Sequence, residues 1–299
     1  MEPVKIAITG GAGFLGLATV RILIERGHSV LALDRSAAHS PPDLAFRACD
    51  VTEQDDVTAA FAAFRPQAVI HLAAMLTLDS KADIVAATRV NALGTAHVFA
   101  AAKACGAERV IYASSVAALG DADIGPGDAS VPRPASVYGA TKAYGEHLAR
   151  AFAADEPGMT LIGLRFGSVY GPGRERGWRA IQTLVEQAAA GEPSIVYPDF
   201  AEPIDWTWIE DAAEVAARAV VAPLTEHRVF NVAGDKRMMR EAAAHLARRC
   251  PDSSFIAQPD TTPPAAWNFA NDGLATAIGY VPQTQMEEGI DRMLAAAGR

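Results

Sequence analysis

Apolar residues in the first half of the chain gather into short runs separated by helical patterns. The runs cover residues 4–9, 29–33, 68–74 and 109–113. Between them, apolar positions recur at the spacing of an amphipathic helix, as over 14–26 and 55–64. Mostly apolar strands that alternate with helices are typical of a parallel sheet covered by helices on both faces. We therefore expect an α/β fold with a doubly wound parallel sheet.

The pattern continues through the second half of the chain, where strands are fewer. Long helical patterns cover 82–105 and 138–154, and a strand is expected at 160–166. Helices are expected at 178–190, 210–221, 238–249 and 285–297, and extended pieces at 195–197, 203–209 and 228–234. The chain contains no repeat and no low-complexity linker. These segments therefore predict a smaller α/β portion that shares one body with the large sheet.

A glycine cluster directly follows the first predicted strand. Gly10, Gly13 and Gly16 are spaced as G-x-x-G-x-x-G, and the helical pattern starts at Phe14 and Leu15. Glycine permits positive φ angles in the turn and lets a pyrophosphate approach the backbone. The start of the helix offers unpaired N–H groups and a positive dipole end to the phosphates. This is a variant of the dinucleotide fingerprint, although three glycines alone are equally compatible with a structural turn.

An acidic residue ends the second predicted strand. Asp34 follows Gly16 at close to the spacing of about 20 residues that is expected of a ribose-binding carboxylate. A carboxylate there accepts hydrogen bonds from the adenosine ribose hydroxyls and would repel a 2′-phosphate, which favours NAD over NADP. Arg35 weakens this preference, because a neighbouring arginine can accommodate that phosphate.

A tyrosine and a lysine share one helix face later in the chain. Tyr138 and Lys142 are four residues apart, and the strand before them ends in Ser114 and Ser115. A tyrosine with a pKa near 10 is a poor base at neutral pH, and a cationic lysine beside it favours the phenolate. A serine hydroxyl can hydrogen-bond the substrate oxygen. Next to a nicotinamide, these groups can take a proton from an alcohol whose carbon loses a hydride.

Composition excludes several other classes of function. The net charge is -9 without a basic tract, so nucleic acid is not an expected partner. No uncharged apolar run reaches the roughly 18 residues of a membrane span, and no signal peptide is recognised. Cys49, Cys105 and Cys250 are odd in number and far apart, which predicts reduced thiols in a cytoplasmic protein. No histidine has zinc-motif spacing, so no metal is expected, and we expect His71 to be a core residue at a strand end.

The motifs together resemble those of the extended short-chain dehydrogenase/reductases, the NAD-dependent epimerase/dehydratase family. They occur in family order over about the first 175 residues. The segments that carry the resemblance are 10–16, Asp34, Asp50-Val51, His71 to Ala74, Asn91 to Thr95, Ser114-Ser115, Tyr138 to Lys142 and Arg165 to Gly173. The resemblance implies a Rossmann domain at 1–170, to which 204–235 returns, and a substrate-binding portion made of 171–203 and 236–299.

The resemblance also implies roles for individual residues. Ser115, Tyr138 and Lys142 would be catalytic, with Tyr138 as the base and Lys142 also holding the nicotinamide ribose. The residues that would contact NAD are Gly10, Gly13, Phe14, Leu15, Gly16, Asp34, Arg35, Asp50, Val51, Leu72, Ala73, Ala74, Asn91, Ser114, Tyr138, Lys142, Ser168 and Val169. Asp50 and Val51 would flank the adenine, Ala73 and Ala74 would line the cofactor channel, and Ser168 and Val169 would contact the nicotinamide end.

The sequence departs from the sugar-nucleotide members of that family at one place. Those members commonly carry a phosphate-binding arginine where this chain has Ile204. Arginines instead crowd the loop after Gly173, where Arg174 could pair a substrate carboxylate, with Trp178 beside it. A solvated basic loop is an equally good interpretation. Trp206 could stack on a sugar face or could be a core residue.

We therefore expect an NAD-dependent oxidoreductase that transfers a hydride at a secondary alcohol of a small sugar, sugar acid or hydroxy acid. Alternatives are an NAD-dependent sugar or nucleotide-sugar epimerase or dehydratase, and a non-catalytic nucleotide-sensing protein. Family resemblance suggests a homodimer through the helical patterns at 82–105 and 138–154, since small side chains allow close helix approach.

Overall fold

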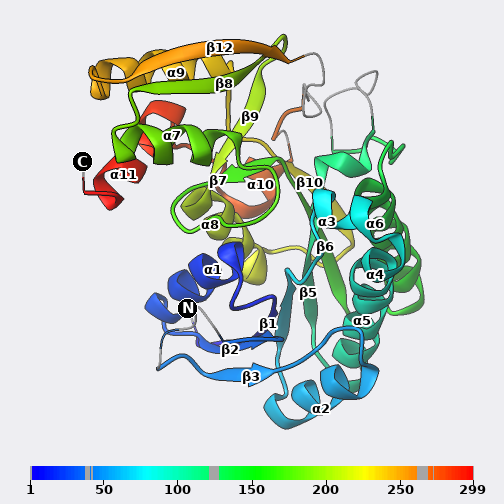
Figure 1. The fold of residues 1–299 in the computed structure, drawn as a ribbon. Coiled ribbons are helices and arrows are strands. Elements are labelled where there is room, and N and C mark those ends of the chain that lie inside the picture. The colour runs from blue at the N-terminus through cyan, green and yellow to red at the C-terminus, as the bar shows by residue number, and fades with distance from the viewer. Residues whose placement is uncertain are drawn as a thin grey trace.

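The centre of the molecule is a parallel sheet of seven strands, as expected (Figure 1). The computed structural model describes residues 2–37, 41, 43–120, 128–260, 269–271 and 273–298. The strands, in sheet order, are β10 (Arg228–Val232), β6 (Thr160–Phe166), β5 (Arg109–Ser115), β4 (Ala68–His71), β1 (Lys5–Thr9), β2 (Ser29–Asp34) and β3 (Phe46–Ala48). The chain reverses its winding direction between β1 and β4. Ligands of open α/β sheets bind at the carboxyl ends of the strands at such a point.

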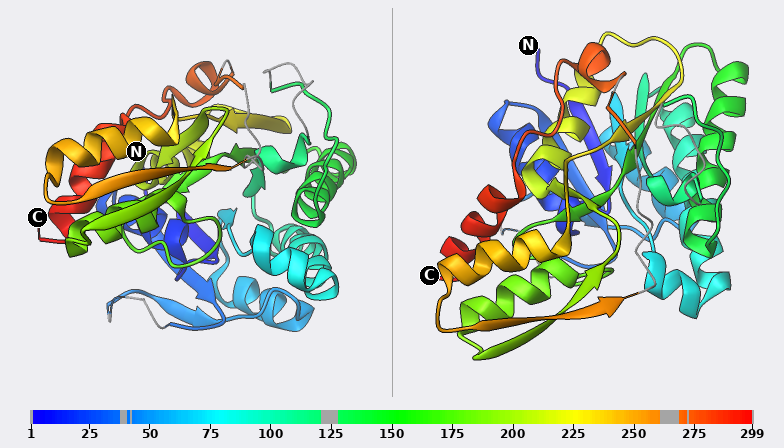
Figure 2. Two further views of the ribbon diagram at one scale, coloured as in Figure 1. Left: turned by 45° about the horizontal axis from the view of Figure 1, so that its top comes forward. Right: turned by 90° about the horizontal axis from the view of Figure 1, so that it is seen from above.

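Helices cover both faces of this sheet, which explains why its central strands are apolar on both sides. One face carries α1 (Phe14–Glu25), α8 (Ile209–Val221) and α10 (Leu274–Ile278). The other face carries α2 (Gln54–Phe64), α5 (Gly94–Cys105) and α6 (Val137–Asp155). Figures 1 and 2 show these two helical layers on either side of the strands. Among the described residues, no helix combines the length and the apolarity needed to cross a bilayer.

The long helical pattern at 82–105 is not one helix. It is divided into the end of α3 (Thr77–Ala82), α4 (Ile84–Ala87), a π-helical stretch η1 (Thr88–Leu93) and α5. Asp83 accepts a hydrogen bond from Ala86 N at 2.9 Å and starts α4 as its cap. Gly94 packs against Val51, and a Cβ on Gly94 would lie 2.8 Å from a Val51 methyl group. Apolar periodicity does not show such local breaks, because the pieces follow one another with few or no residues between them.

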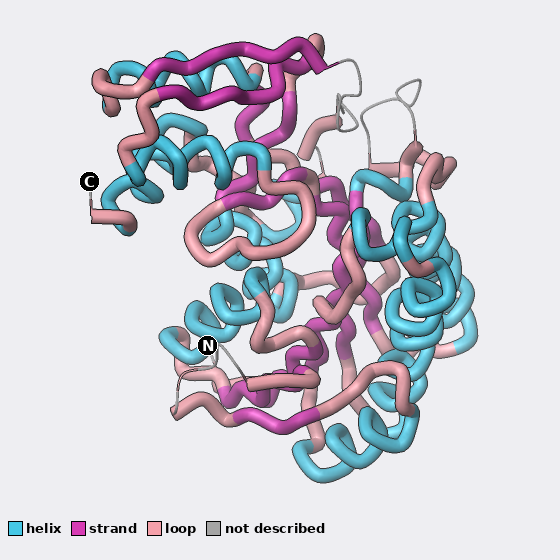
Figure 3. The backbone as a smooth tube through the Cα atoms, viewed as in Figure 1, coloured by secondary structure: helices cyan, strands magenta, loops and turns pink. Residues whose placement is uncertain are grey.

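The remaining elements form a smaller portion beyond the carboxyl edge of the large sheet. It contains a three-stranded sheet of β11 (Asp235–Arg237), β9 (Ile204–Trp208) and β7 (Ser168–Tyr170), and a parallel pair of β12 (Ser254–Asp260) and β8 (Ser194–Phe200). Helices α7 (Ala180–Ala190), α9 (Met239–Arg249) and α11 (Met286–Ala296) pack with them. Figure 3 shows the β8–β12 pair apart from the central strands. β9 was expected within the segment that returns to the large sheet, but that return starts only with α8 and β10.

Aromatic side chains hold the three-stranded sheet against its neighbours. Trp206 is 1% exposed, and its ring lies 5.3 Å from that of Trp178 in a stacked arrangement. Tyr170 meets Trp206 and Trp208 edge to face, at centroid distances of 6.0 Å and 5.3 Å. The Trp206 indole N–H donates to Arg237 O at 3.1 Å, so its polar atom is satisfied inside the core.

Candidate active site

The glycine loop closes tightly on itself and on the end of β4. Gly10 has a φ of +70°, and a Cβ there would lie 2.6 Å from Ala73 N. A Cβ on Gly16 would lie 2.1 Å from Gly10 O. These approaches exclude any side chain at either position. The predicted cofactor residue Leu72 and the predicted channel residue Ala73 therefore lie directly against the loop, and Ala74 follows them in the chain.

Helix α1 starts in the manner that a dinucleotide pyrophosphate requires. Its N-cap residue is Gly13, which has extended backbone angles and no side chain to cap the N–H groups of the first turn. Phe14 and Leu15 supply those N–H groups at the positive end of the helix dipole. The loop has the backbone donors and the lack of Cβ atoms that NAD would need, so the residues present fit that cofactor.

Asp34 lies beside the glycine loop at the end of β2. Its carboxylate accepts hydrogen bonds from Ala12 N at 3.3 Å and from Arg35 N at 2.8 Å. The two N–H bonds orient the carboxylate between the loop and the strand. Arg35 follows it with an exposed side chain. The relative positions of Asp34 and the loop are those expected for a ribose-binding carboxylate.

Other predicted cofactor residues gather at the same edge of the sheet, because the carboxyl ends of parallel strands share one edge. Asp50 and Val51 follow β3, Ser114 is the last residue but one of β5, and Ser168 and Val169 begin β7 just after β6. The Asp50 carboxylate accepts from Thr52 N at 2.9 Å and caps the turn into α2.

Asn91 and Ser114 have their side chains occupied within the protein. The Asn91 amide contacts Met75 N at 2.8 Å, Met75 O at 3.0 Å and Thr141 Oγ1 at 3.1 Å. It therefore ties η1 and the segment after β4 to α6. The Ser114 hydroxyl donates to Glu146 Oε1.

Ser115, Tyr138 and Lys142 come together between the end of β5 and the start of α6. Ser136 caps α6 by accepting from Gly139 N at 3.0 Å, which places Tyr138 in the first turn. The Ser115 hydroxyl is 3.4 Å from Phe166 O and accepts from Ala117 N at 3.2 Å, and it lies close enough to the Tyr138 hydroxyl to lower the pKa of Tyr138. Lys142 Nζ donates to Ala113 O at 2.8 Å and lies 5.6 Å from the centre of the Tyr138 ring. The structure thus brings the three predicted catalytic residues into one cluster.

The electrostatics of this cluster differ from the simple pairing expected from the sequence. Burial raises the pKa of Tyr138, whereas the Ser115 hydroxyl and the positive charge of Arg174 lower it. Burial also lowers the pKa of Lys142 to about 8. Arg174 is therefore the cation that lowers the pKa of Tyr138, while Lys142 donates to a β5 carbonyl.

Arg174 reaches into the site from the loop after β7. Its guanidinium lies 5.7 Å from the centre of the Phe14 ring, and Nη1 donates to Val169 O. Its Nε is buried with no hydrogen-bond partner among the described residues. Arg179 also has a buried, unpaired Nε, but its Nη2 pairs with Glu186 on α7 at 2.7 Å. Arg174 is therefore the arginine of this loop whose charge acts on Tyr138, the predicted base.

The predicted aromatic substrate residues are placed differently from each other. Trp178 is half-buried and stacks on Trp206. Trp206 itself is a core residue, so the core interpretation is the one that the structure supports. Ile204, at the position of the phosphate-binding arginine, is also buried and carries no donor.

Asp205 is a buried carboxylate that was not among the residues predicted from the sequence. Its carboxylate accepts from Thr207 Oγ1 and Gly234 N, both at 2.9 Å, and a Cβ on Gly167 would lie 2.5 Å from Oδ1. Burial raises the pKa of Asp205 to about 7, against these hydrogen bonds. The bond from Gly234 holds β9 to the link between β10 and β11, and the carboxylate packs closely against Gly167 between β6 and β7.

A second polar group missed from the sequence is the buried ion pair of Arg165 and Glu146. Arg165 Nε and Nη2 contact the two Glu146 oxygens at 2.8 Å and 2.7 Å. Glu146 follows Lys142 by four residues, and this helical spacing was the signal in the sequence that Glu146 shares a helix face with the predicted catalytic residues. His71, in contrast, is a buried strand-end residue as expected, held between Thr9 at 2.7 Å and Thr95 at 3.0 Å.

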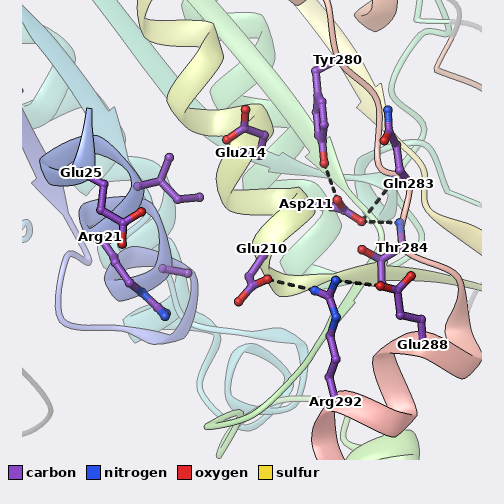
Figure 4. Close-up of a pocket in the computed structure, with 12 residues that line it drawn as sticks. Arg21, Glu25, Glu210, Asp211, Glu214, Tyr280, Gln283, Thr284, Glu288 and Arg292 are labelled. Carbon is purple, nitrogen blue, oxygen red and sulfur yellow. Dashed lines mark hydrogen bonds and ion pairs between the residues drawn. The ribbon is translucent and has the colours of Figure 1, made fainter. Parts of the chain in front are cut away.

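A polar hollow of about 670 Å³ lies away from the catalytic cluster, between α1, α8 and α11 (Figure 4). Three of its charged side chains are paired with each other, and Asp211 is held by neighbouring hydrogen-bond donors. Arg292 contacts Glu210 at 3.1 Å and Glu288 at 2.7 Å, and Asp211 accepts from Thr284 N at 2.8 Å. The hollow contains none of the predicted site residues, and its geometry is that of a solvated groove between helices.

Comparisons with known proteins agree with this geometry. The family model described as "NAD dependent epimerase/dehydratase family" matches residues 6–233. The chain is 29% identical to the 2-alkyl-3-oxoalkanoate reductase of Stenotrophomonas maltophilia, over 98% of this chain and 99% of that protein. It is 30% identical to the dTDP-glucose 4,6-dehydratase of Neisseria gonorrhoeae, over 77% of this chain and 72% of that protein. The crystal structure of Thermus thermophilus UDP-glucose 4-epimerase in complex with NAD superposes with a TM-score of 0.85, at 27% identity, over 98% of this chain and 99% of that one.

Proposed function

The chain belongs to the NAD dependent epimerase/dehydratase family, and from that premise we propose that it oxidises a secondary alcohol of a small sugar, sugar acid or hydroxy acid with NAD. The observation that carries the proposal is the cluster of Ser115, Tyr138 and Lys142 next to the glycine loop. A protein that only senses nucleotides has no need of a base in that position.

The proposed chemistry assigns one task to each residue of the cluster. Bound NAD supplies the hydride acceptor. Tyr138 accepts the proton of the substrate hydroxyl, and Ser115, close to Tyr138, orients that hydroxyl. Lys142 holds positive charge near the phenolate and contacts the ribose. Arg174 adds a second positive charge on the other side of Tyr138.

We propose that the predicted cofactor residues hold NAD rather than NADP. Glycines at 10, 13 and 16 and the first turn of α1 would hold the pyrophosphate. Asp34 would accept the adenosine ribose hydroxyls. The carboxylate already accepts two backbone N–H bonds, which keep it aimed at the loop.

For the substrate, we propose an acid that is small and not linked to a nucleotide. A bound pyrophosphate needs paired charges, because an unpaired buried charge is costly. Ile204 is buried and offers none at the position where sugar-nucleotide relatives have arginine. Arg174 has a buried Nε without a described partner and can clamp one carboxylate.

An NADH-absorbance screen of sugars, uronates, aldonates and hydroxy acids tests the proposal. We expect turnover with an acid and no inhibition by UDP or dTDP. The relatives that act on dTDP-glucose and UDP-glucose favour a second candidate, a nucleotide-sugar epimerase or dehydratase. Competitive inhibition by UDP or dTDP at micromolar concentration would establish that candidate instead. Failure to turn over any compound, with NAD still bound, would favour a sensor.

We further propose a homodimer formed through the helices at 84–105 and 137–155. Several large apolar side chains on them are exposed, namely Ile84, Val85, Leu93 and Tyr144. Two-fold pairing would cover them, and two-fold dimers are the commonest oligomers. Light scattering at micromolar concentration should give the dimer mass, and Val85→Glu should give a monomer. A monomeric wild-type protein would contradict the proposal.

The division of the chain and its location are also proposals. We propose that residues 1–170, with the returning α8 and β10, bind the cofactor, while the smaller portion binds substrate. Cys49, Cys105 and Cys250 are free, which supports the cytoplasm as its compartment.

A further inference from the structure

The ion pair of Arg165 and Glu146 is buried beside the catalytic cluster. The two side chains are 3% and 4% exposed, and two parallel N–H bonds join them. A buried pair of this kind needs its remaining atoms satisfied. Ser114 donates to the same carboxylate. Arg165 Nη1 donates to Asp128 O at 3.1 Å, and Nη2, which also binds Glu146, donates to Ser130 O at 3.0 Å.

Glu146 is also a helical neighbour of Lys142. Residues four apart on a helix face each other closely enough to form ion pairs. Lys142 Nζ contacts Ala113 O, and the Glu146 carboxylate contacts Ser114, the next residue of β5. The two head groups thus lie along one strand, yet the structure pairs Glu146 with Arg165 and leaves Lys142 on a backbone carbonyl.

We propose that Arg165 is a positioning residue that keeps Glu146 away from Lys142. By binding both carboxylate oxygens from β6, it prevents the ion pair that the helix spacing would otherwise allow. Lys142 then stays free of a carboxylate and available to Tyr138 and the cofactor ribose. This inference rests on the proposed function only for the role of Lys142, not for the competition between the two cations.

The charged and titratable groups around this arrangement come from several elements. Lys142 is faced by Tyr138 from its own helix and by His71 from β4. Glu146 is faced by Arg165 from β6, Tyr112 from β5 and His227 before β10. Among these groups of the described chain, Glu146 is the one carboxylate, and the helix spacing places it one turn from Lys142.

The titration of Lys142 tests the proposal without any substrate. The chain has lysines only at Lys5, Lys81, Lys103, Lys142 and Lys236, so lysine labelled with ¹³C at Cε gives few signals, and Lys142→Arg assigns the one of interest. Burial lowers the pKa of Lys142 to about 8 in the wild type. In Arg165→Met, the freed Glu146 should raise the pKa of Lys142 by about one unit or more. In the double variant Arg165→Met/Glu146→Gln, it should return close to the wild-type value.

Controls separate this effect from a general loss of structure. Arg218→Met removes another paired arginine, on α8, and should leave the Lys142 titration unchanged. If Arg165→Met does not fold, Arg165→Gln can replace it, because glutamine keeps hydrogen-bond donors for Asp128 and Ser130 without the positive charge. The pKa of Lys142 should rise in that variant as well. An unchanged Lys142 pKa in a folded single variant, or a raised one in the double variant, would overturn the proposal. Full turnover of Lys142→Met would instead refute the proposed function and leave this result standing.

Discussion

The two ends of the candidate site are built in different ways. At the proposed cofactor end, the surface is formed by backbone atoms and small residues. Gly10 and Gly16 leave no room for a Cβ, and Gly13 leaves the N–H groups in the first turn of α1 uncapped. At the substrate end, large side chains dominate, with Arg174 over Phe14 and Trp178 stacked on Trp206. A binding surface made of backbone atoms suits one ligand that a whole family shares. A surface made of side chains changes its ligand preference with each substitution. We therefore expect mutations at the two ends to separate catalysis and cofactor choice from substrate recognition.

The variant with the largest expected effect on catalysis is Tyr138→Phe, which lies between the two ends of the candidate site. Loss of the phenolic oxygen removes the base, so turnover should fall by about 10² or more. NAD affinity should change little, because the glycine loop and Asp34 are untouched. Steady-state kinetics and calorimetric titration with NAD measure the two effects.

The matched control is Tyr144→Phe, on the same helix but 45% exposed and outside the cluster. It should keep wild-type turnover. If the turnover of Tyr138→Phe stayed within a few-fold of the wild-type turnover, Tyr138 would not be the base, and the proposed mechanism would be wrong.

At the substrate end, Trp206→Ala should act on stability. The side chain is enclosed by Trp178 and Tyr170, and truncation of a buried tryptophan costs about 3–5 kcal/mol of unfolding free energy. Trp178→Ala removes a half-buried ring and should cost less. Urea unfolding compares the two. Equal losses would mean that Trp178 is also a core residue and has no free face for a substrate.

Arg174→Ala should separate substrate binding from cofactor binding. A charge-assisted pair with a carboxylate is worth about 1.5–3 kcal/mol, so KM for an acidic substrate should rise roughly ten- to a hundredfold. A neutral analogue should show little change in KM. Arg176→Ala, an exposed arginine of the same loop, is the control. A uniform change in kcat for acid and neutral analogue alike would assign Arg174 to Tyr138 rather than to the substrate.

The smallest expected effect is on cofactor choice. Asp34→Asn removes the charge that repels a 2′-phosphate, so the ratio of kcat/KM for NAD over NADP should fall by about tenfold, or 1.4 kcal/mol. Asp43→Asn, an exposed change nearby, should leave the ratio unaltered. If the wild type itself prefers NADP, Arg35 rather than Asp34 governs this end of the site.

Local patterns were enough to predict most of the fold. The parallel sheet follows from apolar runs between helical segments, and the cofactor loop follows from glycines after a strand. Tyr138 and Lys142 are four residues apart, so any helix places them on one face. The strands β7, β11 and β12 were missed. β7 and β11 have three residues each, which leaves little periodicity to detect, and β12 pairs only with β8, apart from the large sheet.

By itself, the sequence determined which residues are adjacent along a strand or helix, and therefore the glycine loop and the tyrosine–lysine pair. The tertiary structure decided what those residues face. It buried Trp206 and Ile204 in the core, brought Arg174 beside Tyr138, and paired Glu146 with Arg165 from another strand. These outcomes depend on packing between segments far apart in the chain, where burial and competition among charges select the partner. No local spacing contains that information, because the competing partners become neighbours only once the sheet and its helices have assembled.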